Sequence, residues 1–256
     1  MSFGYNNILN LPERCLLNKK LTKAFFLKNF ELTASEIKRL NNQIESMTWL
    51  ASLQPSNTNI PAIANNDYSY EEIQVIIVKV PIGEVEKDGE KYAELVHKYI
   101  PYQLFLIIED DSQYLISLAD KRINQADKNK RTINHFYPSP VLSKLYKNEI
   151  TEAFYKTITF SQLDKTNLET TYKSCIQAVT QLKTAFITGT YHIRSYKRSQ
   201  DEMKLQYLAQ IITQEIIYLQ KQIKKEPQLN GRVKLNIVIH EKRKKIEEIK
   251  DKLSKV

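Results

Sequence analysis

Three apolar runs in the middle of the chain form its most continuous hydrophobic pattern. They are Glu72–Val80, which is rich in β-branched residues, Leu104–Ile108, and Tyr114–Ala119, which follows a polar turn at 109–112. Short apolar runs bounded by prolines or polar turns are typical of strands buried on both faces of a sheet. Between the first two runs, Glu84–Tyr99 has apolar residues at helical spacing and predicts a helix.

This order of elements predicts a mixed sheet. A strand, a helix and a second strand in sequence are expected to join by a right-handed crossover, with the two strands parallel. The short turn before the third strand makes that strand antiparallel to the second. Thr132–Tyr137 predicts an edge strand before Pro138 and Pro140. We therefore expect an α+β fold, with a βαβ crossover and an antiparallel hairpin in a mixed β-sheet that is packed by helices.

Two further helices are predicted beside the sheet. Thr33 and Glu36 have the spacing of a capping box, and a helical apolar period follows them until the polar loop 55–61. Leu168–Phe186 has one apolar side that includes Cys175, which we expect to be a buried thiol. The apolar positions that define the first of these helices are Ile37, Leu40, Ile44, Met47 and Leu50.

The pattern changes character past Gly189. Two long segments with apolar residues at steps of three or four predict a C-terminal helical or coiled-coil extension, interrupted near Pro227 and Gly231. A strand at Arg232–Ile239 is the alternative, because its apolar residues also alternate. We predict two domains, 1–190 and 191–256. The extension's apolar stripe is Met203, Tyr207, Leu208, Ile211, Ile212, Glu215, Leu219 and Gln222, then Val233, Ile237, Ile246, Ile249 and Leu253.

The positive charge is concentrated in the same extension. Residues 191–256 hold 16 Lys and Arg against 8 Asp and Glu, a net charge of +8, whereas residues 1–190 hold 22 against 21. A local positive field attracts nucleic acid or an acidic protein surface. The alternative is a solvated helical face, because the lysines are interleaved with glutamates.

Composition argues against several classes of protein. The two cysteines are far apart, which disfavours a disulfide framework or a CxxC site, and no signal peptide or membrane span is expected. The chain has five glycines and neither a GxxxxGK nor a GxGxxG motif, so no nucleotide cofactor is predicted. We expect a cytoplasmic protein without a cofactor.

Candidate catalytic chemistry is sparse. A metal-dependent nuclease needs two spaced carboxylates and a lysine, and Asp67, Glu72 and Lys79 are the nearest approximation in the sequence. A degenerate metal site around Glu72, Lys79 and Asp110 is the form in which we keep this alternative. Glu72 and Lys79 are expected to reach solvent at the two ends of one strand. The histidines are isolated from other metal-ligand residues. We assign no catalytic residue and no metal ligand.

Two short segments combine basic and aromatic residues, which can contact phosphates and stack on bases. One is 191–198 and the other is 128–137; the alternative is that both are ordinary surface or hinge segments. The candidate nucleic-acid-binding residues are Tyr191, Arg194, Tyr196, Lys197 and Arg198 in the first, and Lys128, Lys130 and Arg131 in the second.

Several segments, in this order and spacing, resemble the bacterial domain of unknown function family 4391. They are Leu9–Pro12, Thr48–Trp49, Leu53–Ile60, Glu72–Val75, Ile100–Tyr102 and Lys225–Asn236. Members of this family resemble accessory proteins encoded beside helicases and DNA methyltransferases in restriction-like or phage-defence gene sets. The resemblance covers almost the whole chain and implies a non-catalytic subunit without a known active site.

The resulting hypothesis is a non-catalytic adaptor of an antiviral-defence or restriction-like complex. It would dock on a helicase or DNA methyltransferase partner, and its basic C-terminal region would contact that partner or DNA. The alternative is a nuclease or other effector enzyme with a degenerate metal site on the central sheet. A third hypothesis is a toxin-neutralising or structural partner that self-associates through the C-terminal helices.

Overall fold

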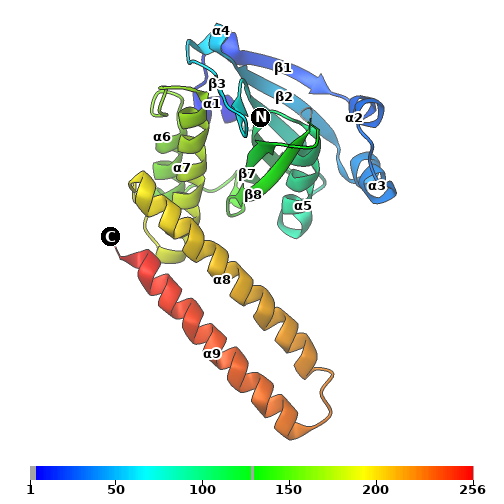
Figure 1. Cartoon of the computed structure of the whole chain (residues 1–256), viewed down its shortest axis with the longest axis vertical. Helices are drawn as coiled ribbons and strands as arrows, with labels where there is room; N and C mark the ends of the chain where they lie inside the picture. The colour runs from blue at the N-terminus through cyan, green and yellow to red at the C-terminus, as the bar shows by residue number, and fades with distance from the viewer. Residues whose placement is uncertain (1–3, 128–129, 256) are drawn as a thin grey trace. The chain divides into compact units, whose positions relative to one another are not determined.

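The computed structural model of the chain describes residues 4–127 and 130–255. It divides into two compact units, Met1–Leu182 (unit 1) and Lys183–Val256 (unit 2). Unit 1 contains the sheet, and unit 2 contains the two long C-terminal helices (Figure 1). The long helix α7, Leu168–Thr188, contributes residues to both units.

Unit 1 confirms the predicted α+β class with a mixed sheet. Its strands have the order β1-β2-β5-β6-β7-β8, and β9 also pairs with β7. A separate small sheet pairs β3 with β4. The strands are β1 Leu16–Leu21, β2 Ser46–Leu53, β3 Ile63–Ala64, β4 Ser69–Tyr70, β5 Ile73–Lys79, β6 Gln103–Glu109, β7 Gln113–Ile123, β8 Arg131–Pro138 and β9 Leu142–Ser143.

The centre of the sheet is the predicted crossover. Strands β5 and β6 are parallel, with Ile73 opposite Gln103, and helix α5, Glu84–Tyr99, connects them. Strand β7 returns antiparallel to β6, and β8 forms the edge beyond it. The apolar runs and the turn at 109–112 were sufficient to predict these pairings.

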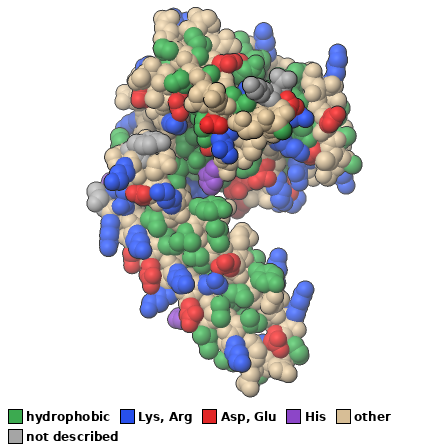
Figure 2. Space-filling model, in the orientation of Figure 1, with side chains coloured by type: hydrophobic (Ala, Val, Ile, Leu, Met, Phe, Trp, Pro, Cys, Tyr) green, Lys and Arg blue, Asp and Glu red, His purple; other side chains and the backbone are tan. Residues whose placement is uncertain are grey.

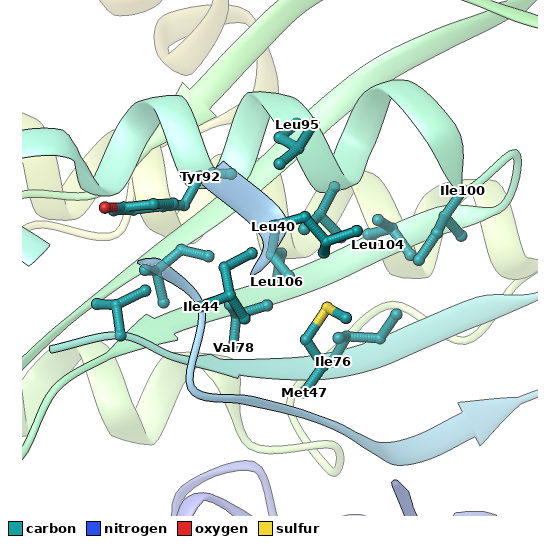
Figure 3. Close-up of a cluster of buried hydrophobic side chains, with 14 of the residues drawn as sticks. Leu40, Ile44, Met47, Ile76, Val78, Tyr92, Leu95, Ile100, Leu104 and Leu106 are labelled. Atoms are coloured by element: carbon teal, nitrogen blue, oxygen red, sulfur yellow. The ribbon is translucent and has the colours of Figure 1, made fainter. Parts of the chain in front are cut away.

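Helices cover both faces of this sheet. Alternate side chains of β5 and β6 pack against α5 and α3 in one buried cluster, which includes Ile76, Tyr92 and Leu104 (Figure 3). The opposite side chains of β6, Phe105 and Ile107, face α1 and α6. The remaining short helices of unit 1 are α1 Tyr5–Leu9, the 3₁₀ turn Glu13–Cys15, α2 Lys23–Asn29, α3 Ala34–Gln43, α4 Pro55–Thr58 and α6 Glu149–Ile158.

The prediction of one helix from Thr33 to Leu50 is wrong in its second half. The capping box of Thr33 and Glu36 starts α3 as expected, but α3 ends at Gln43. Met47 and Leu50 instead belong to β2, where Met47 lies opposite Val78 of β5. A spacing of three fits a helix and not a regular strand, but the register of β2 shifts between Trp49 and Ala51, so the strand does not show a clear period of two.

Glu36 makes the start of α3 sensitive to acid. Partial burial alone raises the pKa of its carboxyl, but hydrogen bonds from Lys98, Thr33 and Tyr99 outweigh burial and lower the pKa to about 2. The folded-state pKa thus lies below the ordinary value of 4.5. The stabilisation from Glu36 is therefore complete above pH 4.5 and is lost as the pH falls toward 2.

We expect this group to contribute on the order of 2 kcal/mol to the loss of stability over that acid range. Urea unfolding of the wild type and Glu36→Gln at a series of acidic pH values measures the contribution. The difference in unfolding free energy between the two proteins should shrink as the pH falls. A difference that stays constant with pH would contradict the ionic role of Glu36.

Unit 2 is an antiparallel helical hairpin. Helix α8, Tyr196–Ile223, and helix α9, Leu229–Ser254, are joined by a short connection that contains Pro227. The predicted interruption is confirmed, although Gly231 lies inside α9, and the alternative strand at Arg232–Ile239 is wrong. The residues packed between the helices are Leu205, Ala209, Ile212, Ile216, Leu219 and Ile223 of α8 with Ile239, Ile246, Ile249 and Leu253 of α9.

The predicted apolar stripe of the extension is only partly the one that is buried. Ile212 and Leu219 lie in the helix interface, but Tyr207 and Ile211 of the same predicted stripe are exposed. The buried positions follow steps of three and four that begin at Leu205. Helix α8 therefore has two apolar stripes, one buried and one exposed, and the predicted stripe combined residues of both.

Candidate nucleic-acid interface

The described part of the predicted segment 128–137, residues 130–137, lies at the edge of the sheet in unit 1. Lys128 falls outside the described residues. Lys130 is exposed and lies 3.5 Å from a carboxylate oxygen of Asp127. Arg131 is the first residue of β8, and its guanidinium donates to the backbone oxygen of Lys130 at 3.2 Å. This segment therefore keeps one exposed cation, Lys130, directly before the edge strand β8.

The predicted segment 191–198 lies at the base of the hairpin in unit 2, where two of its arginines converge on one acid. The Nε atoms of Arg194 and Arg198 lie 3.2 Å and 3.1 Å from the same carboxylate oxygen of Glu202. The Glu202 side chain is fully buried, and that of Arg194 is only 7% exposed. These two guanidinium groups are partly neutralised inside the unit.

The same carboxylate connects three helices of unit 2. Its second oxygen accepts a hydrogen bond from Thr184 of α7 at 3.2 Å, and Gln206 donates to the Thr184 hydroxyl at 2.8 Å. Arg198 also donates to the backbone oxygens of Lys252 and Lys255, at 2.9 Å and 2.8 Å. It thereby satisfies carbonyl groups at the end of α9 that no helical partner reaches. We call Thr184, Arg194, Arg198, Glu202 and Gln206 the root cluster.

The other predicted residues of this segment differ in exposure. Ser195 caps α8 by accepting a hydrogen bond from the backbone N–H of Arg198 at 3.3 Å. Tyr191 is half-buried and Lys197 is exposed, while the side chain of Tyr196 lies outside what the structure describes. Of the basic residues predicted here, Lys197 is thus the exposed one, and the arginines serve the root cluster.

The three residues of the alternative nuclease site do not come together. Glu72 precedes β5, is buried, and accepts a hydrogen bond from Ser52 at 2.5 Å. This corrects the expectation that Glu72 reaches solvent. Lys79 ends β5 and lies 2.8 Å from Asp111. Glu72 and Lys79 are seven residue steps apart along extended chain, which is about 23 Å.

Asp110 has a structural role in the β6–β7 turn. Its carboxylate accepts hydrogen bonds from the backbone N–H groups of Ser112, Gln113 and Gly83, the last at 3.0 Å. Burial alone raises the pKa of Asp110, but these N–H donors outweigh burial and lower it. The turn is thereby tied to the start of α5, as expected for an acid in a tight turn.

Two ionisable side chains buried in unit 1, His97 and Lys121, make hydrogen bonds that support the fold. Burial lowers the pKa of His97 well below its usual value, and its Nε2 lies 3.2 Å from the Ser117 hydroxyl. Burial also lowers the pKa of Lys121, whose ammonium nitrogen donates to the backbone oxygens of Ile100 and Tyr102. Lys121 therefore fastens the connection from α5 to β6.

Two further observations concern metal and thiol chemistry. Within residues 4–127 and 130–255, no group of three or more His, Cys, Asp or Glu side chains is arranged to hold a metal ion. Burial raises the pKa of Cys175 to about 12, and it also raises that of Cys15. Neither thiol is poised to act as a thiolate nucleophile.

The outer surface of the hairpin combines apolar and basic side chains (Figure 2). We call residues 221–234, which connect α8 to α9, the hairpin tip; they include five Lys and Arg residues and one Glu. The sequence predicted a basic C-terminal region but did not locate its charge at the hairpin tip. The apolar residues of the two helices were expected to lie in the interior. The exposed large apolar residues of the hairpin are Tyr207, Leu208, Ile211, Ile217, Tyr218, Leu229, Val233, Ile237 and Val238.

A surface cavity of about 410 Å³ opens at the tip. Its lining comes from the end of α8, the connection and one residue of α9. The residues are Tyr218, Lys221, Gln222, Lys225, Glu226 and Leu235. Its volume lies within the range of roughly 300–1,000 Å³ that is common for ligand pockets.

A family model described as a domain of unknown function, DUF4391, matches residues 9–246. The chain belongs to the DUF4391 family. The match extends over the sheet of unit 1 and most of the hairpin, so the resemblance seen in the sequence is confirmed. Neither a curated protein nor a solved structure matches this DUF4391 chain. Among its described residues, no helix has both the length and the apolar character needed to cross a membrane.

Proposed function

We propose that this DUF4391 protein is a non-catalytic accessory subunit of a bacterial DNA-processing complex with a defence or restriction-like role. It docks on a helicase or DNA methyltransferase and contacts DNA through its basic C-terminal unit. The observation that carries the proposal is the hairpin, because most of the net charge lies there together with exposed apolar side chains. Charge attracts DNA, and exposed apolar surface favours a protein partner.

The polar residues of the sheet support a structural role for unit 1. Glu72 bonds to Ser52, Lys79 pairs with Asp111, and Asp110 accepts backbone N–H groups. The three side chains of the alternative metal site thus each make hydrogen bonds or ion pairs that stabilise strands and turns. This engagement favours an adaptor over an enzyme acting at the sheet.

The outer side of α9 is the proposed docking surface for the protein partner. Leu229, Val233 and Ile237 follow one another at steps of four and are 75%, 48% and 55% exposed. They face away from Ile239 and the rest of the interior stripe. Because the exposed Arg232 and Lys234 adjoin this stripe, the complementary surface is an apolar patch with acidic residues at its border.

Co-expression with a helicase and with a DNA methyltransferase of the same gene set, the proposed partners, tests the proposal. We expect the wild type to co-elute with at least one of them in size-exclusion chromatography. We expect Val233→Gln with Ile237→Gln to abolish co-elution, because the substitutions remove apolar contact and glutamine preserves the helix. Leu145→Gln, at an exposed apolar residue of unit 1, is the matched control and should co-elute like the wild type.

Failure of the wild type to co-elute with either enzyme would contradict the accessory role. Co-elution of the double variant at the wild-type level would instead place docking away from α9. Circular dichroism of each variant verifies that helix content is unchanged.

A further inference from the structure

One aromatic and two basic side chains lie together at the end of α8. Tyr218 and Lys221 are three residues apart on one side of the helix, and Lys225 follows in the connection and lines the same cavity. Tyr218 is 61% exposed, and both lysines are exposed. The interior stripe of α8, which includes Ile216 and Leu219, uses other faces. Tyr218 and Lys221 are therefore not part of the buried stripe between the two helices.

The ring of Tyr218 is held in place although it is exposed. Gln222 donates from Nε2 to the Tyr218 hydroxyl at 2.6 Å, one turn further along α8. Both residues line the tip cavity, together with Leu235 of α9. An aromatic ring fixed in this way loses little conformational freedom when a flat ligand packs on its face.

The electrostatic field at the tip is positive. Residues 221–234 hold five basic side chains against Glu226. The Glu226 carboxylate accepts the backbone N–H of Gln228 at 2.9 Å, and its backbone oxygen accepts from Arg232 at 2.6 Å. Glu226 thus serves the start of α9, and the surrounding lysines dominate the field that a ligand meets.

We propose that the hairpin tip binds an unpaired strand of nucleic acid. Lys221 and Lys225 contact its phosphates, and one base stacks on Tyr218 in the cavity. An acidic protein surface would use the lysines but would have no need of an aromatic ring held beside them, whereas stacking and phosphate contact together are how single strands are bound. This inference rests on the DNA contact of the proposed function and gives it a position and a strand preference.

Fluorescence anisotropy with a labelled oligonucleotide of about 16 nucleotides, a length that covers known site sizes, tests the inference on the full chain. We expect tighter binding to the single strand than to a duplex of the same length. Tyr218→Ala should weaken single-strand binding by about fivefold or more, which is the low end of one stacked base. Lys221→Ala with Lys225→Ala should lower the slope of log affinity against log salt by about 1 to 2.

Matched controls distinguish the loss of side chains at the hairpin tip from the loss of a tyrosine or two lysines elsewhere in the chain. Tyr146→Ala removes an exposed tyrosine of unit 1, and Lys19→Ala with Lys20→Ala removes two exposed charges from β1. Both should bind like the wild type. All substituted side chains are exposed, and circular dichroism verifies that each variant is folded.

Three results would overturn the inference. Tip variants that bind like the wild type would place the nucleic-acid site elsewhere and leave the proposed accessory role standing. Displacement of the oligonucleotide by polyglutamate of equal charge, at equal concentration, would identify an acidic protein as the occupant. Absence of binding by the wild type to either nucleic acid would overturn this inference and the DNA contact of the proposed function, whereas partner docking is decided separately by co-elution.

Discussion

Replacing Glu202 with alanine is expected to destabilise unit 2 more than any other single change considered. The buried carboxylate of Glu202 is shared by Arg194 and Arg198, and Arg194 is itself almost fully buried. Removing the acid removes the carboxylate that neutralises the Arg194 guanidinium in a site that is almost fully buried. Breaking a buried pair in this way costs about 3–5 kcal/mol.

The effect should extend across the helices that the root cluster connects. Thr184 loses its acceptor, and Arg198 loses the carboxylate that orients it toward the end of α9. Urea unfolding followed by helical ellipticity, combined with hydrogen exchange at residues 184–206, measures the loss. Exchange at the base of the hairpin should rise before the sheet is affected.

Glu247→Ala is the matched control for this prediction. Glu247 pairs with Lys250 on the exposed side of α9 at 2.9 Å, and such surface pairs contribute about 0–1 kcal/mol. The control should unfold close to the wild type. Equal unfolding midpoints for Glu202→Ala and Glu247→Ala would contradict the importance of the root cluster.

Tyr172→Phe is expected to destabilise unit 1 although it removes a single oxygen atom. The Tyr172 hydroxyl donates to the backbone oxygen of Leu104 at 3.0 Å and accepts from the backbone N–H of Ala119 at 2.9 Å. The β6–β7 ladder has its last pair at Leu106 and Ser117, and in the same register Leu104 and Ala119 would lie opposite each other two positions further along. The Tyr172 hydroxyl thus takes the place of the backbone hydrogen bonds that the two strands do not make there.

Without this hydroxyl, the buried backbone groups at Leu104 and Ala119 lose their bridge. Leaving such groups unsatisfied costs about 1–3 kcal/mol. Urea unfolding should show that loss for Tyr172→Phe and almost none for Tyr146→Phe, whose side chain is largely exposed. A Tyr172→Phe protein as stable as the wild type would show that the ladder tolerates the gap.

The centre of the fold could be predicted because its signals are local. The apolar runs of β5 and β6 have α5 between them, and Pro81 and Pro101 mark its ends. Strand β2 could not be separated from α3, because its period becomes visible only when Met47 pairs with Val78. Helix α6 was not predicted, because it has only ten residues and its capping box pairs Asn148 with Thr151 in place of the Ser/Thr and Glu/Gln of the usual motif.

The site was harder to predict than the fold, because exposure depends on which stripe of a helix is buried. Arg198 lies in a basic and aromatic segment, yet it bonds to carbonyl groups more than fifty residues away in the chain. No local sequence pattern predicts a contact between residues so far apart in the chain. The exposure of Tyr218 likewise follows only once Ile216 and Leu219 are known to fill the interior of the hairpin.

Hydrogen exchange of the full chain with and without a single-stranded oligonucleotide tests most directly whether the protein acts through its hairpin or through its sheet. The account predicts protection of the connection and the first turn of α9, residues 224–231, with the sheet unchanged. The backbone N–H groups at a helix start have no helical acceptor, so they report a bound ligand. Protection instead at the ends of β5 and β6, around Lys79 and Asp111, with an unaffected hairpin, would contradict the account.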